Sequence, residues 1–180
     1  MYREAFVLLA LILCCSGCSK NKHQTVSQAG KEMSRLMKEH RFDEAAHVGL
    51  QALTGGPSDD SLYYWVALSY AQQGALDSES REQSLKLVNE YSDRSININP
   101  RDQLNRFNVA TVLEYAGDLS TESKCQFYGK ALGLLADIAG GVSSGELEIN
   151  GTPHSAAPLN KAVAEENSSI SKKLKDARCE

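Results

Sequence analysis

The stretch PSDDSLYYWVALSYAQQG, residues 57–74, decides the fold because its two ends set an interval that recurs along the chain. Pro57 and Gly74 lie 17 positions apart, and Pro100 and Gly117 lie 17 positions apart again. Proline stops one helix and pre-sets the entry to the next, and glycine allows a left-handed conformation at a helix end. The interval therefore predicts a row of helices joined by regularly spaced turns.

The interval is interrupted once. The two prolines, and likewise the two glycines, lie 43 residues apart, and an insertion of nine residues within 75–99 explains both distances. Without it the turns recur every 17 residues, or 34 per helix pair, and His40 fits as the turn 17 residues before Pro57. We interpret the inserted region as one long helix, from about Glu79 to Ile96, that projects beyond an ordinary repeat.

Side-chain size and spacing agree with paired helices. Small residues stand where paired helices would cross closely: Ala45, Ala52, Ala67 and Ala110. Met33, Leu36 and Met37 follow the i, i+3, i+4 pattern of a buried helical stripe. Asp102 follows Pro100 and is a predicted N-cap.

The 34-residue helix–turn–helix interval resembles that of the tetratricopeptide repeat (TPR) family. The first repeat, about 26–59, matches the family at Ala29, Met33, Leu36, Phe42, Ala45, Ala52 and Pro57. The second, about 60–102, matches it at Tyr63, Ala67, Tyr70, Gly74 and Pro100. The third, about 103–139, matches it at Ala110, Leu113 and Gly117. His40 replaces the turn glycine, Arg106 stands where an aromatic residue is usual, and Ala131 comes about two positions late.

The resemblance implies an all-α fold, an antiparallel helix-pair solenoid of about three repeats over 26–139 with a C-terminal capping helix. The first helix of each TPR repeat lines a groove that binds a protein or peptide. Carried over, the groove positions are Met37, Lys38, Tyr64, Leu68, Gln72, Phe107, Thr111, Glu114 and Tyr115. In the alternative interpretation, Tyr64 and Phe107 only pack between repeats. The basic residues of chaperone-binding TPR clamps are not reproduced, so capture of a C-terminal carboxylate is not implied.

Two further segments follow the repeats. Residues 140–158 are rich in Gly, Ser and Pro and are predicted to be a loop, although the alternation over 146–150 leaves a short strand as an alternative. Residues 159–178 are predicted to be the capping helix that a repeat array needs. Its apolar stripe is Leu159, Val163, Ile170 and Leu174. We interpret the charged residues on its other faces as solvated.

The amino terminus has the layout of a secretory signal peptide. An apolar run over 5–13 follows Arg3 and is too short to span a bilayer. Ser16-Gly17-Cys18 resembles the end of the lipobox of bacterial lipoproteins, although Cys15 stands where leucine is usual. The resemblance implies that residues 1–17 are removed, that Cys18 is diacylated, and that 18–25 form a flexible tether. By analogy, Ser19 favours the outer membrane, facing the periplasm; plain secretion is the alternative.

The remaining cysteines and the net charge bear on three features: a disulfide, a metal site and nucleic-acid binding. Cys125 and Cys179 could pair in an oxidising compartment or remain two thiols. One cysteine cluster at 14–18, with no second cluster of Cys or His, does not indicate a metal site. A net charge of −4 argues against nucleic acid as a partner.

No nucleophile elbow, phosphate loop or zinc-protease motif is present, so we predict no enzyme and no cofactor. The chain is interpreted as a membrane-anchored scaffold or adaptor lipoprotein. Assembly factors of envelope, pilus or secretion systems are the nearest analogues. Two alternatives stay open: an envelope enzyme that uses the 139–158 loop with His154, and a self-associating structural lipoprotein.

Overall fold

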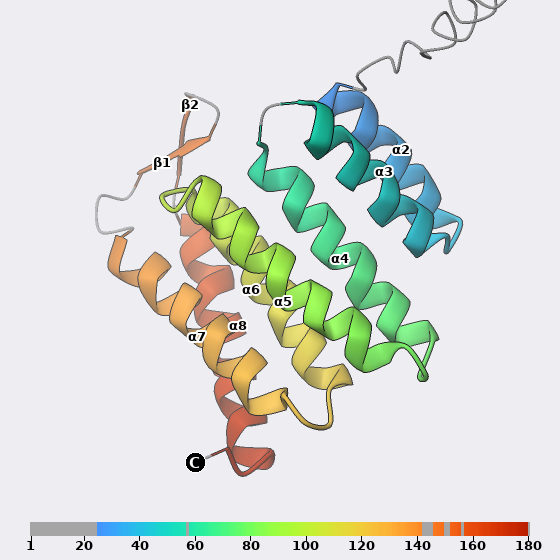
Figure 1. Cartoon of the computed structure of the whole chain (residues 1–180). Helices are drawn as coiled ribbons and strands as arrows, with labels where there is room; N and C mark the ends of the chain where they lie inside the picture. Colours follow the sequence, from blue (N-terminus) through green and yellow to red (C-terminus); the bar gives the residue numbers. More distant parts are fainter. Residues whose placement is uncertain (1–24, 57, 142–145, 150–151, 156, 180) are drawn as a thin grey trace, which may run out of the picture.

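A computed structural model describes residues 25–56, 58–141, 146–149, 152–155 and 157–179. Within these residues the chain forms seven helices, which pack in neighbouring pairs, and one two-stranded hairpin (Figure 1). The predicted all-α core is therefore present. Cys18, the signal segment and Pro57 lie outside the described residues.

Three helix pairs follow one another along the chain. Their bounds are α2 Val26–Lys38 with α3 Phe42–Gly55, α4 Asp60–Leu76 with α5 Arg81–Ile98, and α6 Gln103–Leu119 with α7 Lys124–Gly141. The first pair has helices of 13 and 14 residues, whereas both later pairs have helices of 17 and 18 residues. The extra length is therefore shared by both later pairs. The predicted single long helix from Glu79 to Ile96 corresponds to α5, shifted by two residues.

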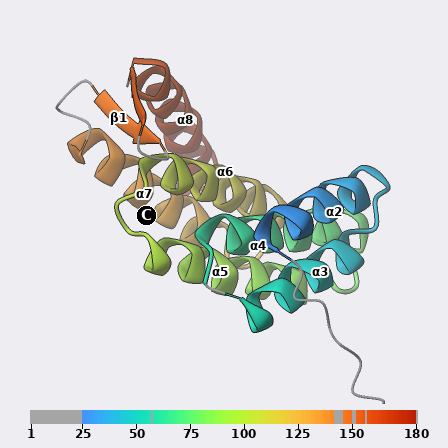
Figure 2. The same ribbon diagram turned by 90° about the horizontal axis from the view of Figure 1, so that it is seen from above.

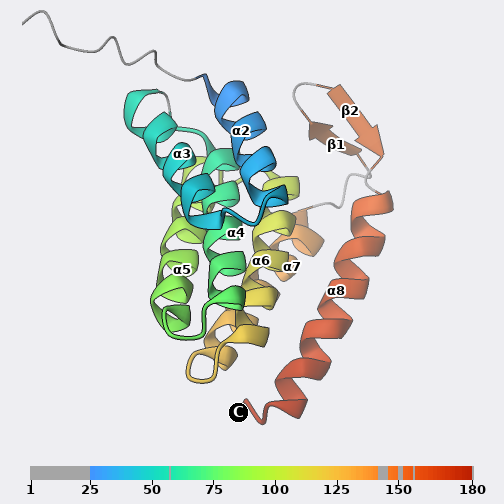
Figure 3. The ribbon, with the colours of Figure 1, turned by 90° about the vertical axis from the view of Figure 1, so that its right-hand side faces the viewer.

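The helices form two layers, which we name from Figure 1. The back layer contains α2, α4 and α6, with α4 in contact with both of its neighbours, and the front layer contains α3, α5 and α7. Figures 2 and 3 show the same division from above and from the side. Alternate helices therefore share one surface, so the side chains that α4 and α6 direct away from the core lie on a common face.

Each back-layer helix begins at a side-chain cap. Thr25 and Gln28 form a reciprocal capping box at the start of α2. Asp59 accepts a hydrogen bond from the Leu62 N–H at 2.9 Å. The predicted cap Asp102 is confirmed, since it accepts from the Asn105 N–H at 2.8 Å. Such caps satisfy amide donors that have no partner within the helix, and they fix where each helix starts.

The left-handed backbone lies at His40 and not at the two turn glycines. His40 has φ 59°, the Arg41 N–H donates to the Leu36 carbonyl at 2.9 Å, and the His40 N–H donates to the Met37 carbonyl at 3.1 Å. This is the Schellman arrangement that ends a helix. Gly74 and Gly117 instead lie inside α4 and α6. Their predicted role as left-handed helix ends is therefore wrong.

Gly117 is needed because another helix touches its backbone. A Cβ atom at this position would lie 2.5 Å from Cε1 of Tyr128 on α7, too close for any real side chain. Gly49 on α3 is in the same situation, because a Cβ there would lie 2.6 Å from Cγ2 of Val66 on α4. Paired or consecutive helices therefore meet through glycine, in the manner expected of the small alanines Ala45, Ala52, Ala67 and Ala110, which are all buried.

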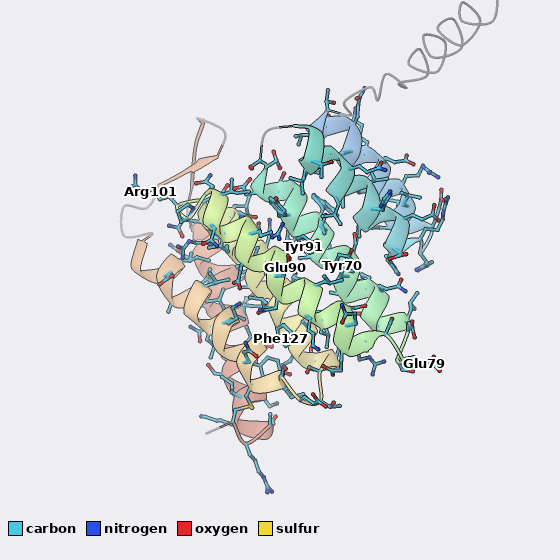
Figure 4. The ribbon with its side chains drawn as sticks, in the orientation of Figure 1. Tyr70, Glu79, Glu90, Tyr91, Arg101 and Phe127 are labelled. Carbon is cyan, nitrogen blue, oxygen red and sulfur yellow. A yellow bond between two sulfur atoms is a disulfide. The ribbon has the colours of Figure 1, made fainter. Side chains whose placement is uncertain are left out.

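An aromatic stack joins α4 to α5. The Tyr91 ring lies between Tyr63 and Tyr70, with ring centroids 6.2 and 5.7 Å away and nearly parallel planes. The Arg94 guanidinium carbon lies 5.3 Å from the centroid of the Tyr91 ring. Figure 4 labels Tyr70 and Tyr91 where the two helices meet. Stacked rings and a cation over a ring face each add modest stabilisation beyond the area that they bury.

A buried polar contact ties three helices at one end. The Ser95 hydroxyl on α5 donates to the Asp60 carbonyl at 2.7 Å, and the Asn105 amide on α6 donates to Ser95 Oγ at 3.0 Å. Ser95 and Asn105 are both buried. Buried polar groups are costly unless they are paired, so this contact favours a single register between α4, α5 and α6.

The segment predicted as a loop over 140–158 contains a β-hairpin. Strand β1, Glu146–Ile149, pairs antiparallel with β2, Thr152–Ser155, with Leu147 opposite His154. The alternating pattern had left this strand as the alternative, and the loop prediction is wrong for these residues. Helix α8, Ala157–Asp176, then packs on α7 and α6. Leu159, Val163 and Ile170 of its predicted stripe are buried.

We expect Gly117→Ala to lower the free energy of unfolding by about 1–3 kcal/mol, because the added methyl group must displace Tyr128 or separate α6 from α7. Urea unfolding followed by circular dichroism measures the change. Gly129→Ala is the matched control: it lies on α7 with open space around a Cβ, and should raise stability by about 0.5–1 kcal/mol. Equal stabilisation by both substitutions would show that the close approach at Gly117 does not constrain the fold.

Candidate functional site

The nine residues predicted to line a groove lie on the three back-layer helices. Lys38 is exposed at the end of α2, and the other eight residues are half-buried. Tyr64 and Leu68 lie one turn apart on α4, and Phe107 and Thr111 lie one turn apart on α6. Residues at this spacing share one side of a helix, and α4 and α6 are neighbours.

We name the surface formed by Tyr64, Leu68, Phe107, Thr111 and Tyr115 the aromatic face. Its apolar members pack against the core on one side and remain partly accessible on the other. Burial raises the pKa of the Tyr64 hydroxyl, and the Tyr64 ring meets the edge of Trp65 at a centroid distance of 5.5 Å. Neither Tyr64 nor Phe107 is fully buried, so both retain surface that another molecule can contact.

Glu114, also predicted for the groove, is engaged by α8. Its carboxylate accepts hydrogen bonds from Ser169 Oγ at 2.9 Å and from Lys173 Nζ at 2.8 Å. Lys173 also pairs with Asp118 at 2.6 Å, and the Tyr128 hydroxyl donates to Asp118 at 2.7 Å. The carboxyl group of Glu166 on α8 is hydrogen-bonded to Glu114. We name Glu114, Asp118, Tyr128, Glu166, Ser169 and Lys173 the α6–α8 cluster.

Protonation in the α6–α8 cluster follows from its composition. Three carboxyl groups, from Glu114, Asp118 and Glu166, face one ammonium group, that of Lys173. Burial, together with the hydrogen bond to Glu114 and its negative charge, raises the pKa of Glu166 to about 7. Burial acts against ionisation of Glu114 as well, but its hydrogen bonds from Glu166, Lys173 and Ser169 hold its pKa below the usual range. At neutral pH the two glutamates therefore share a proton that is only partly bound, because the pKa of Glu166 is about 7.

Lys173 departs from the solvated role interpreted for the charged residues of this helix. Burial lowers its pKa, but hydrogen bonds to Asp118 and Glu114 outweigh that effect and raise the pKa above its ordinary value. Lys173 lies 55 residues after Asp118 in the chain, and no local spacing in the sequence links the two. The contact depends on how α8 folds back onto α6.

A disulfide joins Cys125, near the start of α7, to Cys179, just beyond α8, with their Cα atoms 5.5 Å apart. A second left-handed residue, Arg178 with φ 55°, ends α8 and turns the chain. In this turn the Cys179 N–H donates to the Leu174 carbonyl at 3.1 Å. The covalent loop spans 54 residues. Closing a loop of this length lowers the conformational entropy of the unfolded chain and so stabilises the folded protein by about 4 kcal/mol.

Two of the histidines lie at the surface. His40 and His47 are exposed, and the His47 ring nitrogen lies 2.8 Å from the Gln51 amide nitrogen. His154 lies in β2 by its backbone. Within the described part of the chain, no three His, Cys, Asp or Glu side chains are grouped so as to hold a metal ion. In that same part, every helix is too short or too polar to cross a bilayer.

Comparisons with protein-family models, with curated proteins and with solved structures find no match to this chain.

We expect Glu166→Gln to remove most of a pH dependence of stability between pH 4.5 and 7. A carboxyl group whose folded-state pKa is raised stabilises fully below its unfolded pKa, and that contribution is lost as the pH rises through the folded value. The parent protein should thus lose stability over this range from this group. The glutamine keeps a donor toward Glu114 and cannot ionise, so the variant should be more stable than the parent at pH 8.

Urea unfolding at pH 5 and pH 8 measures the effect, with Glu165→Gln as control because its side chain is 70% exposed. The control should have the same free energy of unfolding as the parent at both pH values. If the free energy of unfolding of Glu166→Gln also equals that of the parent at both, Glu166 does not carry a raised pKa. The opposing contribution of Glu114 lies below pH 4.5, outside the range compared.

Proposed function

We propose that this chain is a lipid-anchored scaffold, facing the bacterial periplasm, that binds a protein or peptide partner on the aromatic face. The observation that carries the proposal is the half-buried row of Tyr64, Leu68, Phe107 and Tyr115 across two neighbouring helices. Partly accessible aromatic side chains on rigid helices bury large area on binding at small entropic cost. For that reason they dominate many protein–protein interfaces.

The arrangement of helices supports a TPR-like interpretation of this face. Three helix pairs follow one another along the chain, and the first helices of the pairs form the back layer. In the family that the sequence resembles, this is the layer that lines the binding groove. Arg106, which departs from the family pattern, binds Asp137 of α7 at 2.6 Å and so keeps a contact within the third pair.

The chemistry of the aromatic face favours an uncharged, apolar segment of the partner. Its side chains are aromatic, aliphatic or hydroxyl-bearing, and Thr111 uses its own hydroxyl to bind the Asn108 carbonyl at 2.8 Å. Glu114 at its edge is already paired with Lys173. Binding would be noncovalent and would need no cofactor.

The membrane anchor is proposed from the sequence. The apolar run over 5–13 and the Ser16-Gly17-Cys18 end favour diacylation of Cys18. Two acyl chains provide stable anchoring where a single chain gives only reversible binding. The short polar segment before α2 would then hold the helical array near the membrane surface.

We expect Tyr64→Ala with Phe107→Ala to reduce recovery of crosslinked partners at least tenfold, because both aromatic anchors of the face are removed. Crosslinking in cells, purification and mass spectrometry measure the recovery. Leu76→Ala with Ile98→Ala is the control, since these apolar side chains are exposed and are not members of the aromatic face. Unchanged partners in the first, folded variant would exclude the aromatic face as the binding surface.

Labelling with a palmitate analogue tests the anchor. We expect the label to be incorporated by the parent and by Cys15→Ser, and to be lost in Cys18→Ser, because only Cys18 follows the small residues that precede the lipidated position. Label retained in Cys18→Ser would contradict the proposed anchor.

A further inference from the structure

A hollow of about 290 Å³ opens in the front layer, on the other side of the array from the aromatic face. It lies between α5 and α7, which run side by side in Figure 1, and α6 behind them forms its floor. Its walls are mainly apolar: Ile96, Val109, Leu113 and Leu134. A concave, mostly apolar site with a few polar groups is the usual form of a small-molecule site.

Ser92 gives this hollow a polar group without a partner. Its side chain borders the hollow and is 1% exposed, yet its hydroxyl oxygen has no hydrogen-bond partner among the described residues. A buried hydroxyl left unpaired destabilises the folded protein. A ligand that brought a hydrogen-bonding atom to Ser92 would remove this penalty, and an entirely apolar ligand would not.

The charges at the mouth favour a cation. The side chains of Asp93 and Asp137 border the hollow and are 52% and 64% exposed. Lys130 also borders it, but its ammonium group is held by Asn89 at 2.7 Å and by both carboxylate oxygens of Asp93, at 2.7 and 2.9 Å. The carboxylates therefore keep accessible lone pairs, whereas most of the donors of the lysine are in use.

Arg106 binds a single oxygen of Asp137, at 2.6 Å, which leaves the other oxygen of that carboxylate available. Each carboxylate is paired with one cation, but the carboxylates are 52% and 64% exposed while Lys130 and Arg106 are 31% and 15% exposed, so an incoming carboxylate would meet mainly the negative sides of the two ion pairs. An incoming ammonium would meet two acceptors.

We propose that this hollow binds a small amphiphilic amine. Its apolar body would lie against Ile96, Val109 and Leu113, its ammonium group would lie at the mouth near Asp93 and Asp137, and a hydroxyl group would reach Ser92. This site does not depend on the proposed scaffold role, because the aromatic face belongs to the back layer.

The test uses two probes with the same ring and opposite charge, tyramine and 3-(4-hydroxyphenyl)propionate, titrated into the full chain and followed by heteronuclear NMR. For so small a ligand we expect a Kd on the order of millimolar for tyramine. The carboxylate probe should bind at least tenfold more weakly, and the binding of tyramine should weaken as the salt concentration rises. Equal binding of the two probes, or no binding of tyramine, would overturn the proposal.

Substitutions at two glycines of α7 test where tyramine binds. Gly133 borders the hollow and has open space around a Cβ, so Gly133→Leu should place its side chain in the site and weaken the binding of tyramine at least tenfold. Gly129 also has open space but does not border the hollow, so Gly129→Leu should bind tyramine as the parent does. Both replace a helical glycine, which favours folding. Binding unchanged by Gly133→Leu would place tyramine elsewhere and reject this site.

Ser92→Ala tests the polar end of the site independently. We expect tyramine to bind about threefold to tenfold more weakly and phenethylamine, which lacks the hydroxyl, to bind unchanged. An equal effect on both amines would exclude a hydrogen bond to Ser92.

Discussion

The fold depends on how closely neighbouring helices approach one another. At Gly117 the backbone of α6 leaves no room for a methyl group beside Tyr128, and at Gly49 the same holds beside Val66. Helices α4 and α5 also lie close together, with the ring of Tyr91 between two tyrosines of α4. Close packing of this kind places alternate helices near enough to form one continuous surface. A larger residue at either glycine would alter the spacing on which the core and the aromatic face both rely.

Helix α8 limits the surface that the back layer can offer. Ser169 and Lys173 engage Glu114, so this end of α6 is occupied by the chain itself. The contact is made by charged and hydroxyl groups, whereas the rest of the aromatic face is apolar. The proposed binding surface therefore ends at a polar boundary, and the charge of that boundary depends on the shared proton of Glu114 and Glu166.

Much of the helix order could be predicted because turns and caps are local signals. The interval between Pro100 and Gly117 places a single helix, and Asp102 marks the start of that helix. The role of Gly117 could not be predicted, since glycine serves both helix ends and close contacts, and only the position of Tyr128 distinguishes them. The front-layer hollow carries no sequence signal. Ser92 and Asp137 are separated by more than a whole helix pair, and an unpaired hydroxyl is a property of packing alone.

The disulfide between Cys125 and Cys179 also has a mechanical consequence. It closes α7, the hairpin and α8 into one covalent ring. Tension applied to the chain beyond Cys179 would pass through the sulfur atoms into the start of α7, and it would bypass everything between the two cysteines. The ring would thus carry almost no load while the bond is intact, and the helices before it, α2 to α6, would bear the strain. Reduction would reverse this order, because α8 would then be the first element to peel away.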